Sequence, residues 1–415
     1  MQATDWTMAQ SRRGEATKDN DGDRRSLVEQ ANELFPVFSA QAAASEAKGA
    51  LTEPAIQALW DGGFFGMWIP RCFGGIESWP TEALGTVEAL SYADGSTGWV
   101  FMALQVAMGS AAAYLEPGTA KELFGKRWPL IAGQGAPNGR ADADGAGYRL
   151  TGRWSYGSGL LHSQWIHTGA AVYENGAPRM LAGGKFPDAR IFILPVSQSE
   201  LCGNWDVLGL RATGSVDYRI DNVFVPEEYT HLQTTKMPRQ GGPLFTLGIF
   251  GISTIGHTGF ALGIGRRVLD ELRGLACADN GRPQMLPQRG GGESFHEQFG
   301  LAEAKVRASR AFAFESWHDI EETLRRGDTA GTRQITLARL ALNYATSAVA
   351  EVCAFAYRYG GGVALRDGIL QRCFRDMNAG TQHATTSTGI LRECAREFLG
   401  LAHGKVWAPR ALIDP

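Results

Sequence analysis

The order of patterns along this 415-residue chain predicts an α+β fold built from three blocks. Apolar residues recur at helical spacing over residues 26–130, and that spacing returns over residues 241–415. Between these blocks, residues 131–240 alternate polar and apolar side chains, as strands with one buried face do. Because helices and strands come in separate blocks rather than in βαβ repeats, a doubly wound nucleotide-binding fold is not expected.

The first block predicts an N-terminal helical domain preceded by a flexible arm. Residues 1–25 are polar, mix acidic and basic side chains and show no secretory signal, so they predict the arm. Further on, Gly95–Leu115 and Gln240–Gly265 carry no formal charge, but both contain several glycines and a Gln or His. A membrane span needs about 20 mainly apolar residues. We therefore expect both stretches to be helices buried inside the protein, with no membrane contact.

The second block predicts a β-barrel-like, mainly antiparallel domain over residues 131–240. Tyr148–Tyr156 and Tyr218–Pro226 alternate in polarity along most of their length. The Asp-Gly pair at 144–145 and the Asn-Gly pair at 175–176 are typical of tight turns between antiparallel strands.

The third block predicts a helical bundle over residues 241–415. An apolar stripe of helical period runs through Ala345–Tyr359, and the glycines at 360–362 are expected to end that helix. A second run of glycines, at 290–292, predicts a loop between helices.

Charge and composition exclude several classes of function. The net charge is −3 and the pI is about 6.3, so the chain has no basic surplus for binding nucleic acid. Its six cysteines form no C-x-x-C pair and no zinc-ligand cluster, which fits free thiols in a reducing cytoplasm. No G-x-G-x-x-G or phosphate-binding loop motif is present.

Three segments carry a resemblance to a known family. They are Ala93–Val100, the pair Gly152–Gly159 and Trp205–Ser215, and Arg375-Asp376 with Ala379–His383. The chain resembles the acyl-CoA dehydrogenase superfamily, which implies an N-terminal helical domain, a central antiparallel β-domain and a C-terminal four-helix bundle. Within it, the chain resembles the two-component, reduced-flavin-dependent monooxygenases, such as hydroxylases of 4-hydroxyphenylacetate and of steroid-derived phenols, and more distantly dibenzothiophene monooxygenase.

The oxygenase branch is favoured because neither position expected for the base of a dehydrogenase has a carboxylate. A dehydrogenase removes a proton next to a thioester and needs a carboxylate for it. In the stretch that resembles the usual seat of this base, the residue is Ala379. The alternative seat resembles Ser253–Gly259, which also has no carboxylate.

The resemblance implies two catalytic residues, His383 and Ser158. An imidazole titrates near neutral pH, so His383 could make a phenol electron-rich or act on the distal oxygen of a flavin C4a-hydroperoxide. A hydroxyl at Ser158 could bond the flavin N5 region and protect that hydroperoxide. Each residue also has a purely structural interpretation, His383 as a helix cap or core residue and Ser158 as a turn residue.

The resemblance further implies flavin-contacting positions, which are Trp99, Gln134, Trp154, Ser155, Ser158, Gly159, Trp205, Arg266, Gly361 and Gly362. Small residues around Ser158 would let the backbone approach a flat ring, and each tryptophan could equally belong to the core. Arg266 is a candidate counter-charge for the flavin phosphate. The glycines at 361–362 match a turn that approaches a flavin bound by a neighbouring subunit, which implies a homotetramer.

The sequence thus predicts a cytoplasmic flavin-dependent monooxygenase that takes reduced FMN or FAD from a separate NAD(P)H:flavin reductase and uses O2 on a small aromatic substrate. Three alternatives remain at this level. The chain could be an acyl-CoA dehydrogenase with its base elsewhere, an N- or S-oxygenase on the same scaffold, or a flavin-free binding protein.

Overall fold

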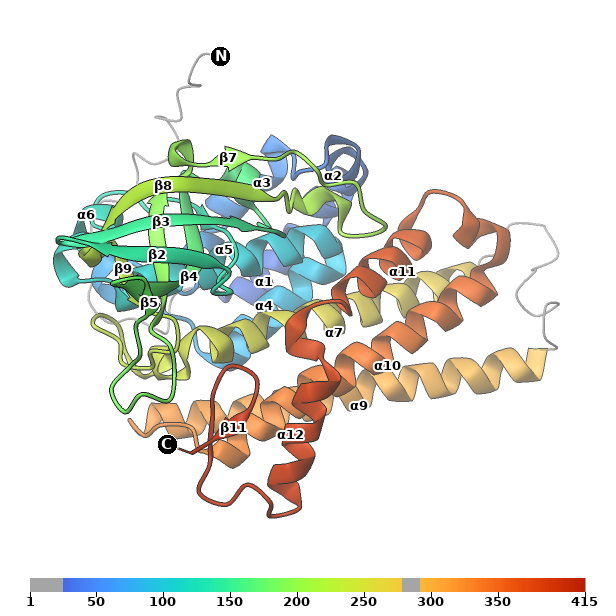
Figure 1. The fold of residues 1–415 in the computed structure, drawn as a ribbon. Helices are drawn as coiled ribbons and strands as arrows, with labels where there is room; N and C mark the ends of the chain where they lie inside the picture. The colour runs from blue at the N-terminus through green and yellow to red at the C-terminus, as the bar shows by residue number, and fades with distance from the viewer. Residues whose placement is uncertain (1–24, 278–291, 415) are drawn as a thin grey trace.

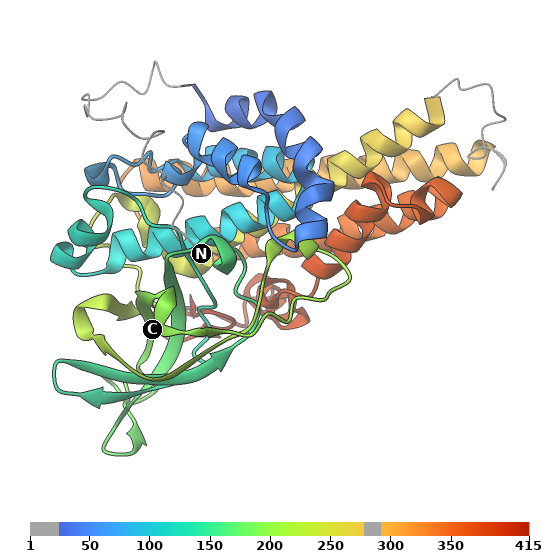
Figure 2. The same ribbon diagram turned by 90° about the horizontal axis from the view of Figure 1, so that it is seen from above.

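The computed structural model describes residues 25–277 and 292–414, and Figures 1 and 2 show the arrangement of its elements. The predicted arm, apart from Arg25, and most of the predicted glycine loop at 290–292 lie outside the described residues. Helices come first, a sheet follows, and helices end the chain, as the sequence pattern predicts. In Figure 2 the strands form a layer of their own beside the N-terminal helices.

Six α-helices make up the N-terminal part, namely α1 (Leu27–Glu33), α2 (Phe35–Lys48), α3 (Glu53–Asp61), α4 (Pro80–Ala93), α5 (Gly95–Tyr114) and α6 (Pro117–Phe124). Helix α1 begins with a capping box, in which Ser26 and Glu29 satisfy each other's backbone N–H groups. Helix α5 begins at Asp94, whose carboxylate accepts the Thr97 N–H at 2.8 Å. Nearly every residue of α5 is buried, as its uncharged sequence predicts.

The central sheet has nine strands, namely β1 (Ile131–Ala132), β2 (Gly139–Asp144), β3 (Gly147–Trp154), β4 (Trp165–Glu174), β5 (Ala177–Pro178), β6 (Ala189–Pro195), β7 (Glu200–Leu201), β8 (Tyr218–Pro226) and β9 (Thr230–Leu232). Its main path is β7-β8-β3-β2-β4-β6-β9, and β1 and β5 pair with β4. Most pairs are antiparallel, but β1 and β2 run parallel to β4. The predicted domain is therefore a mixed sheet with an open path of strands.

Four long helices form the C-terminal bundle, namely α7 (Gly248–Cys277), α9 (Gly292–Arg325), α10 (Thr332–Leu365) and α11 (Ile369–Gly380). Figure 1 shows α9 and α10 side by side. Gly361 bends α10 with φ 57° and ψ −132°, yet the helix continues to Leu365, so the glycines kink it rather than end it. The chain closes with α12 (Thr388–Phe398) and a hairpin of β10 (Val406–Trp407) and β11 (Leu412–Ile413), where the sequence had predicted only helix.

Helix α7 lies in the middle of the protein. Among the described residues, Pro243–Cys277 is the one helical stretch long and apolar enough to cross a membrane, and 89% of its most apolar window is buried. Its apolar surface is thus covered by α4, α5, α9, α10 and α11.

A close approach between the loop at Gly209-Leu210 and α11 holds the sheet domain against the bundle. The Leu210 N–H donates to Oδ1 of Asp376 on α11 at 2.6 Å. Beside it, a Cβ on Gly209 would lie 2.0 Å from the carbonyl oxygen of Arg375. Only a residue without a side chain fits there, so the sequence Gly-Leu at 209–210 sets the distance between the two parts.

We expect Gly209→Ala to lower the free energy of unfolding by about 1–3 kcal/mol, because the added methyl forces α11 away from the loop. Gly118→Ala is the control, since a Cβ there meets nothing within 4 Å and alanine favours the helix. Urea denaturation of both variants checks this. A Gly209→Ala variant as stable as wild type would show that the loop position is not set by this contact.

Asp376 is buried, and burial, with the nearby Asp94 carboxylate as the next cause, raises its pKa to about 7. Because this pKa lies above its ordinary value of 3.8, the folded protein loses stability as the pH rises from about 4 through 7. Asp376→Asn keeps an acceptor for Leu210 and carries no charge. We therefore compare the melting temperature of Asp376→Asn with that of wild type at each pH. We expect the difference, variant minus wild type, to be several degrees larger at pH 8 than at pH 5. An equal difference at both pH values would contradict a proton held by Asp376.

Candidate active site

Trp99 on α5 lies at the centre of the site. Its indole N–H donates to Oγ of Ser158 at 3.1 Å. The edges of its ring system meet His257 on α7 and His383 after α11, at centroid distances of 5.1 and 5.8 Å. Phe260, one turn along α7, completes the packing at 4.9 Å. Residues from three separate parts of the chain thus meet around one buried indole.

A chain of hydroxyl groups fixes the direction of the Ser158 hydrogen bonds. Thr213 Oγ1 donates to the Leu210 carbonyl at 2.8 Å, so it must accept from Ser215 at 2.6 Å. Ser215 then has no second hydrogen, and it accepts from Ser158 at 2.7 Å. Ser158 therefore gives its hydrogen to Ser215, accepts one from Trp99 and keeps one lone pair open.

The two imidazoles of the site are stacked and have opposite tautomers. Their ring centroids are 4.0 Å apart with an interplanar angle of 26°. Nδ1 of His257 is 2.7 Å from the Ser253 carbonyl oxygen, which can only accept, so this nitrogen carries the hydrogen. Nδ1 of His383 caps a short helix and lies 2.8 Å from Thr385 Oγ1, which can donate, and 3.4 Å from the Thr385 backbone N–H, which can only donate, so this nitrogen accepts. His257 therefore presents an accepting Nε2, and His383 presents an Nε2–H donor.

Both imidazoles are neutral at physiological pH. Burial lowers the pKa of His257 to about 4, and burial with the charge of Arg410 and the neighbouring His257 holds the pKa of His383 well below 6.5. Within the described residues neither Nε2 atom has a hydrogen-bond partner, and neither is among the fully buried polar atoms without one. Both Nε2 atoms are thus open to a ligand.

The structure brings together three of the predicted site residues, Trp99, Ser158 and His383. It places Trp154 elsewhere. The Trp154 ring is fully buried in the sheet domain, stacks on Tyr218 and donates its N–H to the Gly169 carbonyl at 2.8 Å. Its packing is that of a core residue, and its contact with flavin stays a prediction.

Two further predicted residues bond to their own surroundings. Trp205 is half-buried and donates to the Leu210 carbonyl at 3.1 Å. Arg266 binds Asp270 and Glu303 through a fork of hydrogen bonds of 2.9–3.1 Å. Two carboxylates already neutralise this guanidinium, and a role of Arg266 as the counter-charge of the flavin phosphate stays a prediction.

The remaining predicted positions lie on loops and at the helix kink. Gln134 follows β1, and its side-chain oxygen accepts the Ala136 N–H at 3.0 Å. Ser155 and Gly159 flank the turn that carries Ser158, where Gly159 has φ 79° and packs against Leu104. Gly361 and Gly362 lie at the kink of α10. Contacts of these five residues with flavin stay a prediction.

His257 is the site residue that sequence reasoning missed. It lies in the segment Ser253–Gly259, the alternative seat of a dehydrogenase base, which has an imidazole but no carboxylate. The signal was present, because an imidazole can accept a proton as a carboxylate does. Its role depends on contact with His383, 126 positions away in the chain, which local sequence patterns do not reveal.

Comparison with known proteins identifies the family. Family models of the acyl-CoA dehydrogenase N-terminal and C-terminal domains match residues 23–122 and 255–388. An indole-3-acetate monooxygenase from Pseudomonas putida is 30% identical over 355 residues, covering 84% of this chain and 87% of that protein. The oxygenase subunit of a Mycobacterium tuberculosis flavin-dependent monooxygenase is 30% identical over 205 residues, covering 49% of this chain and 50% of that protein.

A solved structure supports the fold. XiaF from a Streptomyces species, in complex with FADH2 and glycerol, superposes with a TM-score of 0.78 at 20% identity, covering 90% of this chain and 95% of that one. The chain belongs to the acyl-CoA dehydrogenase family. Within this family it is a flavin-dependent monooxygenase, which uses reduced flavin and O2.

The open lone pair of Ser158 matches the N5–H of a reduced flavin, so the site fits this cofactor. We expect Ser158→Ala to increase the H2O2 formed per flavin consumed by about fivefold to tenfold, the effect of losing one hydrogen bond. Ser199→Ala, which removes a hydroxyl that bonds only its own turn, is the control. Measuring H2O2 against product for both variants checks this, and unchanged coupling in Ser158→Ala would exclude a contact with the flavin.

Proposed function

We propose that this enzyme oxygenates a small aromatic or heteroaromatic molecule that carries an acidic O–H or N–H group. The observation that carries the proposal is the stacked pair of His257 and His383, which offers one acceptor and one donor beside Trp99. The name of the Pseudomonas relative, which acts on an indole, supports a substrate of this class.

His257 would act on the substrate. Its Nε2 is a neutral acceptor, and it can take the hydrogen bond or the proton of a phenol hydroxyl or an indole N–H. Shifting that proton toward His257 makes the aromatic ring electron-rich. Because Ser253 holds Nδ1–H in place, the acceptor points in one fixed direction.

His383 and Ser158 would act on the oxidant. Bound reduced FMN or FAD supplies, with O2, the oxygen atom that enters the substrate. Ser158 accepts the flavin N5–H and so keeps that hydrogen in place. His383 donates from Nε2 toward the oxygen and can return a proton to the oxygen atom that does not enter the substrate. The hydrogen bond from Thr385 supports this donor role over that of the phenol base, which the sequence also allowed.

Relatives of this kind are oxygenase components, which implies a separate reductase as the source of reduced flavin. We also propose a cytoplasmic homotetramer. Support comes from large apolar side chains left exposed on α10, on α12 and on the segment that follows α12, which are Tyr344, Val363, Leu365, Leu391, Phe398, Leu399, Leu401 and Val406. An isolated chain exposing such a group commonly buries it against another copy.

Purified protein supplied with reduced flavin and isotopically labelled O2 tests the activity directly. We expect labelled oxygen in the products of phenols or indoles, detected by mass spectrometry. Labelled products from thioethers or amines alone would assign an S- or N-oxygenase instead. Bleaching of oxidised FAD by an acyl-CoA would assign a dehydrogenase.

Replacing either histidine by phenylalanine keeps the ring stack, and the two variants should lose product formation for different reasons. His257→Phe removes the acceptor, so product formation should fall by about tenfold or more while flavin is still oxidised and H2O2 accumulates. A substrate whose hydroxyl is already ionised at the assay pH should recover part of the loss. Product formation by His383→Phe should not recover with that substrate. Equal behaviour of both variants would contradict the division of roles.

The pH profile offers an independent check. The pKa of His257 is lowered to about 4 and that of His383 lies well below 6.5, so both rings stay neutral where an ordinary histidine titrates. We therefore expect the turnover number to stay level between pH 5.5 and 7.5 and to fall only below about pH 5. A midpoint near pH 6.5 would mean that the rings are solvated.

A further inference from the structure

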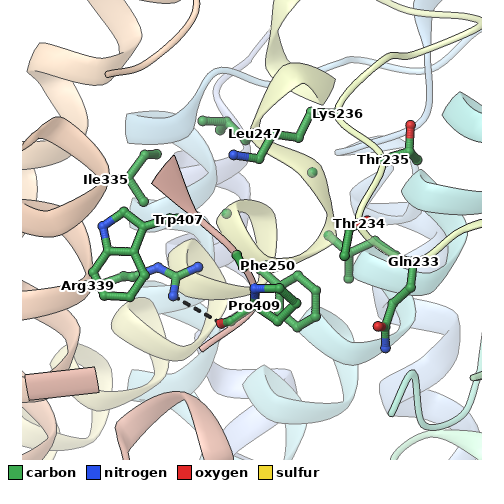
Figure 3. Close-up of a pocket in the computed structure, with 14 residues that line it drawn as sticks. Gln233, Thr234, Thr235, Lys236, Leu247, Phe250, Ile335, Arg339, Trp407 and Pro409 are labelled. Atoms are coloured by element: carbon green, nitrogen blue, oxygen red, sulfur yellow. Dashed lines mark hydrogen bonds between the residues drawn. The ribbon is translucent and has the colours of Figure 1, made fainter. Parts of the chain in front are cut away.

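A small pocket opens where the start of α7 meets α10, the segment after β9 and the C-terminal hairpin (Figure 3). Its volume is about 40 Å³, which is room for about three or four water-sized groups. The lining residues are Gln233, Thr234, Thr235, Lys236, Leu247, Gly248, Ile249, Phe250, Gly251, Ile335, Arg339, Trp407, Ala408 and Pro409. Two of these are cationic and none is a carboxylate, so the pocket has an unbalanced positive charge. It shares no lining residue with the candidate active site.

Arg339 on α10 is the buried source of that charge. It is 7% exposed, and its guanidinium lies 4.2 Å from the ring centroid of Trp407. Nη1 donates to the Pro409 carbonyl at 3.0 Å, which is the dashed line in Figure 3. Nε is fully buried without a partner, and Nη2 has none among the described residues. Nε and Nη2 share one edge of the guanidinium, and such an edge can hold an oxyanion through two hydrogen bonds.

No carboxylate balances the two cations of the pocket. Within residues 25–277 and 292–414, neither Arg339 nor Lys236 forms an ion pair. Lys236 lies at the mouth of the pocket, where partial burial and the charge of Arg339 lower the pKa of its ammonium group. The two cations therefore repel each other, and a buried guanidinium without a counter-ion is costly. An anion in the pocket would remove both costs.

The start of α7 adds to the positive potential. The four residues of its first turn, Gly248–Gly251, all line the pocket. The helix has 30 residues, and its N-terminus carries the positive end of the helix dipole. Arg339, Lys236 and the helix end thus face one space.

We propose that this pocket binds one small inorganic oxyanion, of the phosphate or sulfate kind, which holds the C-terminal hairpin against α10 and α7. Arg339 would bind two of its oxygens through Nε and Nη2, and Lys236 would add a second charge at the mouth. The site is separate from the oxygenation chemistry, so the proposal does not rest on the proposed function.

Size and charge select this class of ligand. A pocket for an organic ligand commonly measures about 300–1,000 Å³, whereas the oxygens of one tetrahedral oxyanion need about the room of three or four waters. The fork of a guanidinium matches a pair of oxygens better than a spherical halide. Two cations and a helix end favour an ion with two negative charges over a single carboxylate.

The anion would act on the hairpin through Arg339. Trp407 lies against the guanidinium of this side chain and donates its N–H to Thr336 Oγ1 at 2.8 Å. Pro409, two residues further on, accepts from Nη1 of the same guanidinium. Both contacts hold the hairpin on α10, and an anion that fixes the guanidinium would strengthen them.

Equilibrium dialysis of the intact protein against radiolabelled inorganic phosphate tests the site, with sodium chloride keeping the ionic strength constant. We expect saturable binding by wild type, weakened about tenfold or more by Arg339→Met and about threefold by Lys236→Met. Lys236→Met changes a side chain at the mouth, so it tests the site even where Arg339→Met affects folding. The control is Lys121→Met on α6, an exposed lysine with no ion pair in the described part of the chain, and it should bind as wild type does.

Thermal unfolding gives a second measurement. At about ten times its dissociation constant, phosphate should raise the Tm of wild type and of Lys121→Met by about 1–3 °C more than sodium chloride does at equal ionic strength. Arg339→Met should lose this difference, because the oxyanion no longer meets the guanidinium.

Four results would overturn the proposal. They are no binding of phosphate by wild type, an equal effect of chloride, unchanged phosphate binding in both pocket variants, and weaker binding of reduced FMN but not of reduced riboflavin in those variants. The last result would mean that the pocket holds the phosphate of a nucleotide. None of these measurements depends on turnover, so they stand or fall separately from the proposed function.

Discussion

The hydrogen bond between Leu210 and Asp376 is the contact on which the site depends. Leu210 has φ 55°, a left-handed conformation that is unfavourable for a leucine and needs support from its surroundings. Its N–H is held by Asp376, and its carbonyl accepts from both Trp205 and Thr213. Because Thr213 donates there, Ser215 and Ser158 must point their hydrogens the same way. One peptide unit thus docks the sheet domain on α11 and orients the hydroxyl that faces Trp99.

Backbone groups likewise decide what the histidines can do. An isolated imidazole can place its hydrogen on either nitrogen, and the two forms differ little in energy. Here the Ser253 carbonyl selects one form for His257, and the Thr385 N–H selects the other for His383. The stacked arrangement at 4.0 Å favours neutral rings, because two imidazolium ions so close would repel. The neighbouring backbone groups therefore make one ring a donor and the other an acceptor. The residue type alone does not decide this.

The order of helices and strands could be predicted from sequence, because hydrophobic period is a local property. Ser158 and His383 could be predicted because their motifs match those of a known family. The roles of Trp154 and Trp99 could not be told apart from sequence, because a tryptophan in the core and one at a site have the same local pattern. Only the packing of Trp154 on Tyr218 in the structure distinguishes the two. The ion pairs of Arg266 could not be predicted either, because its partner Glu303 lies on another helix.

Burial sets the protonation state of the histidine pair. It lowers the pKa of His257 to about 4, and it is the largest cause of the lowered pKa of His383, to which His257 and then Arg410 contribute. A neutral imidazole keeps the lone pair that a proton would occupy, so His257 remains an acceptor where an exposed histidine would begin to titrate. The packing around Trp99 that removes water from the two rings therefore also keeps the acceptor available for the proton of a substrate.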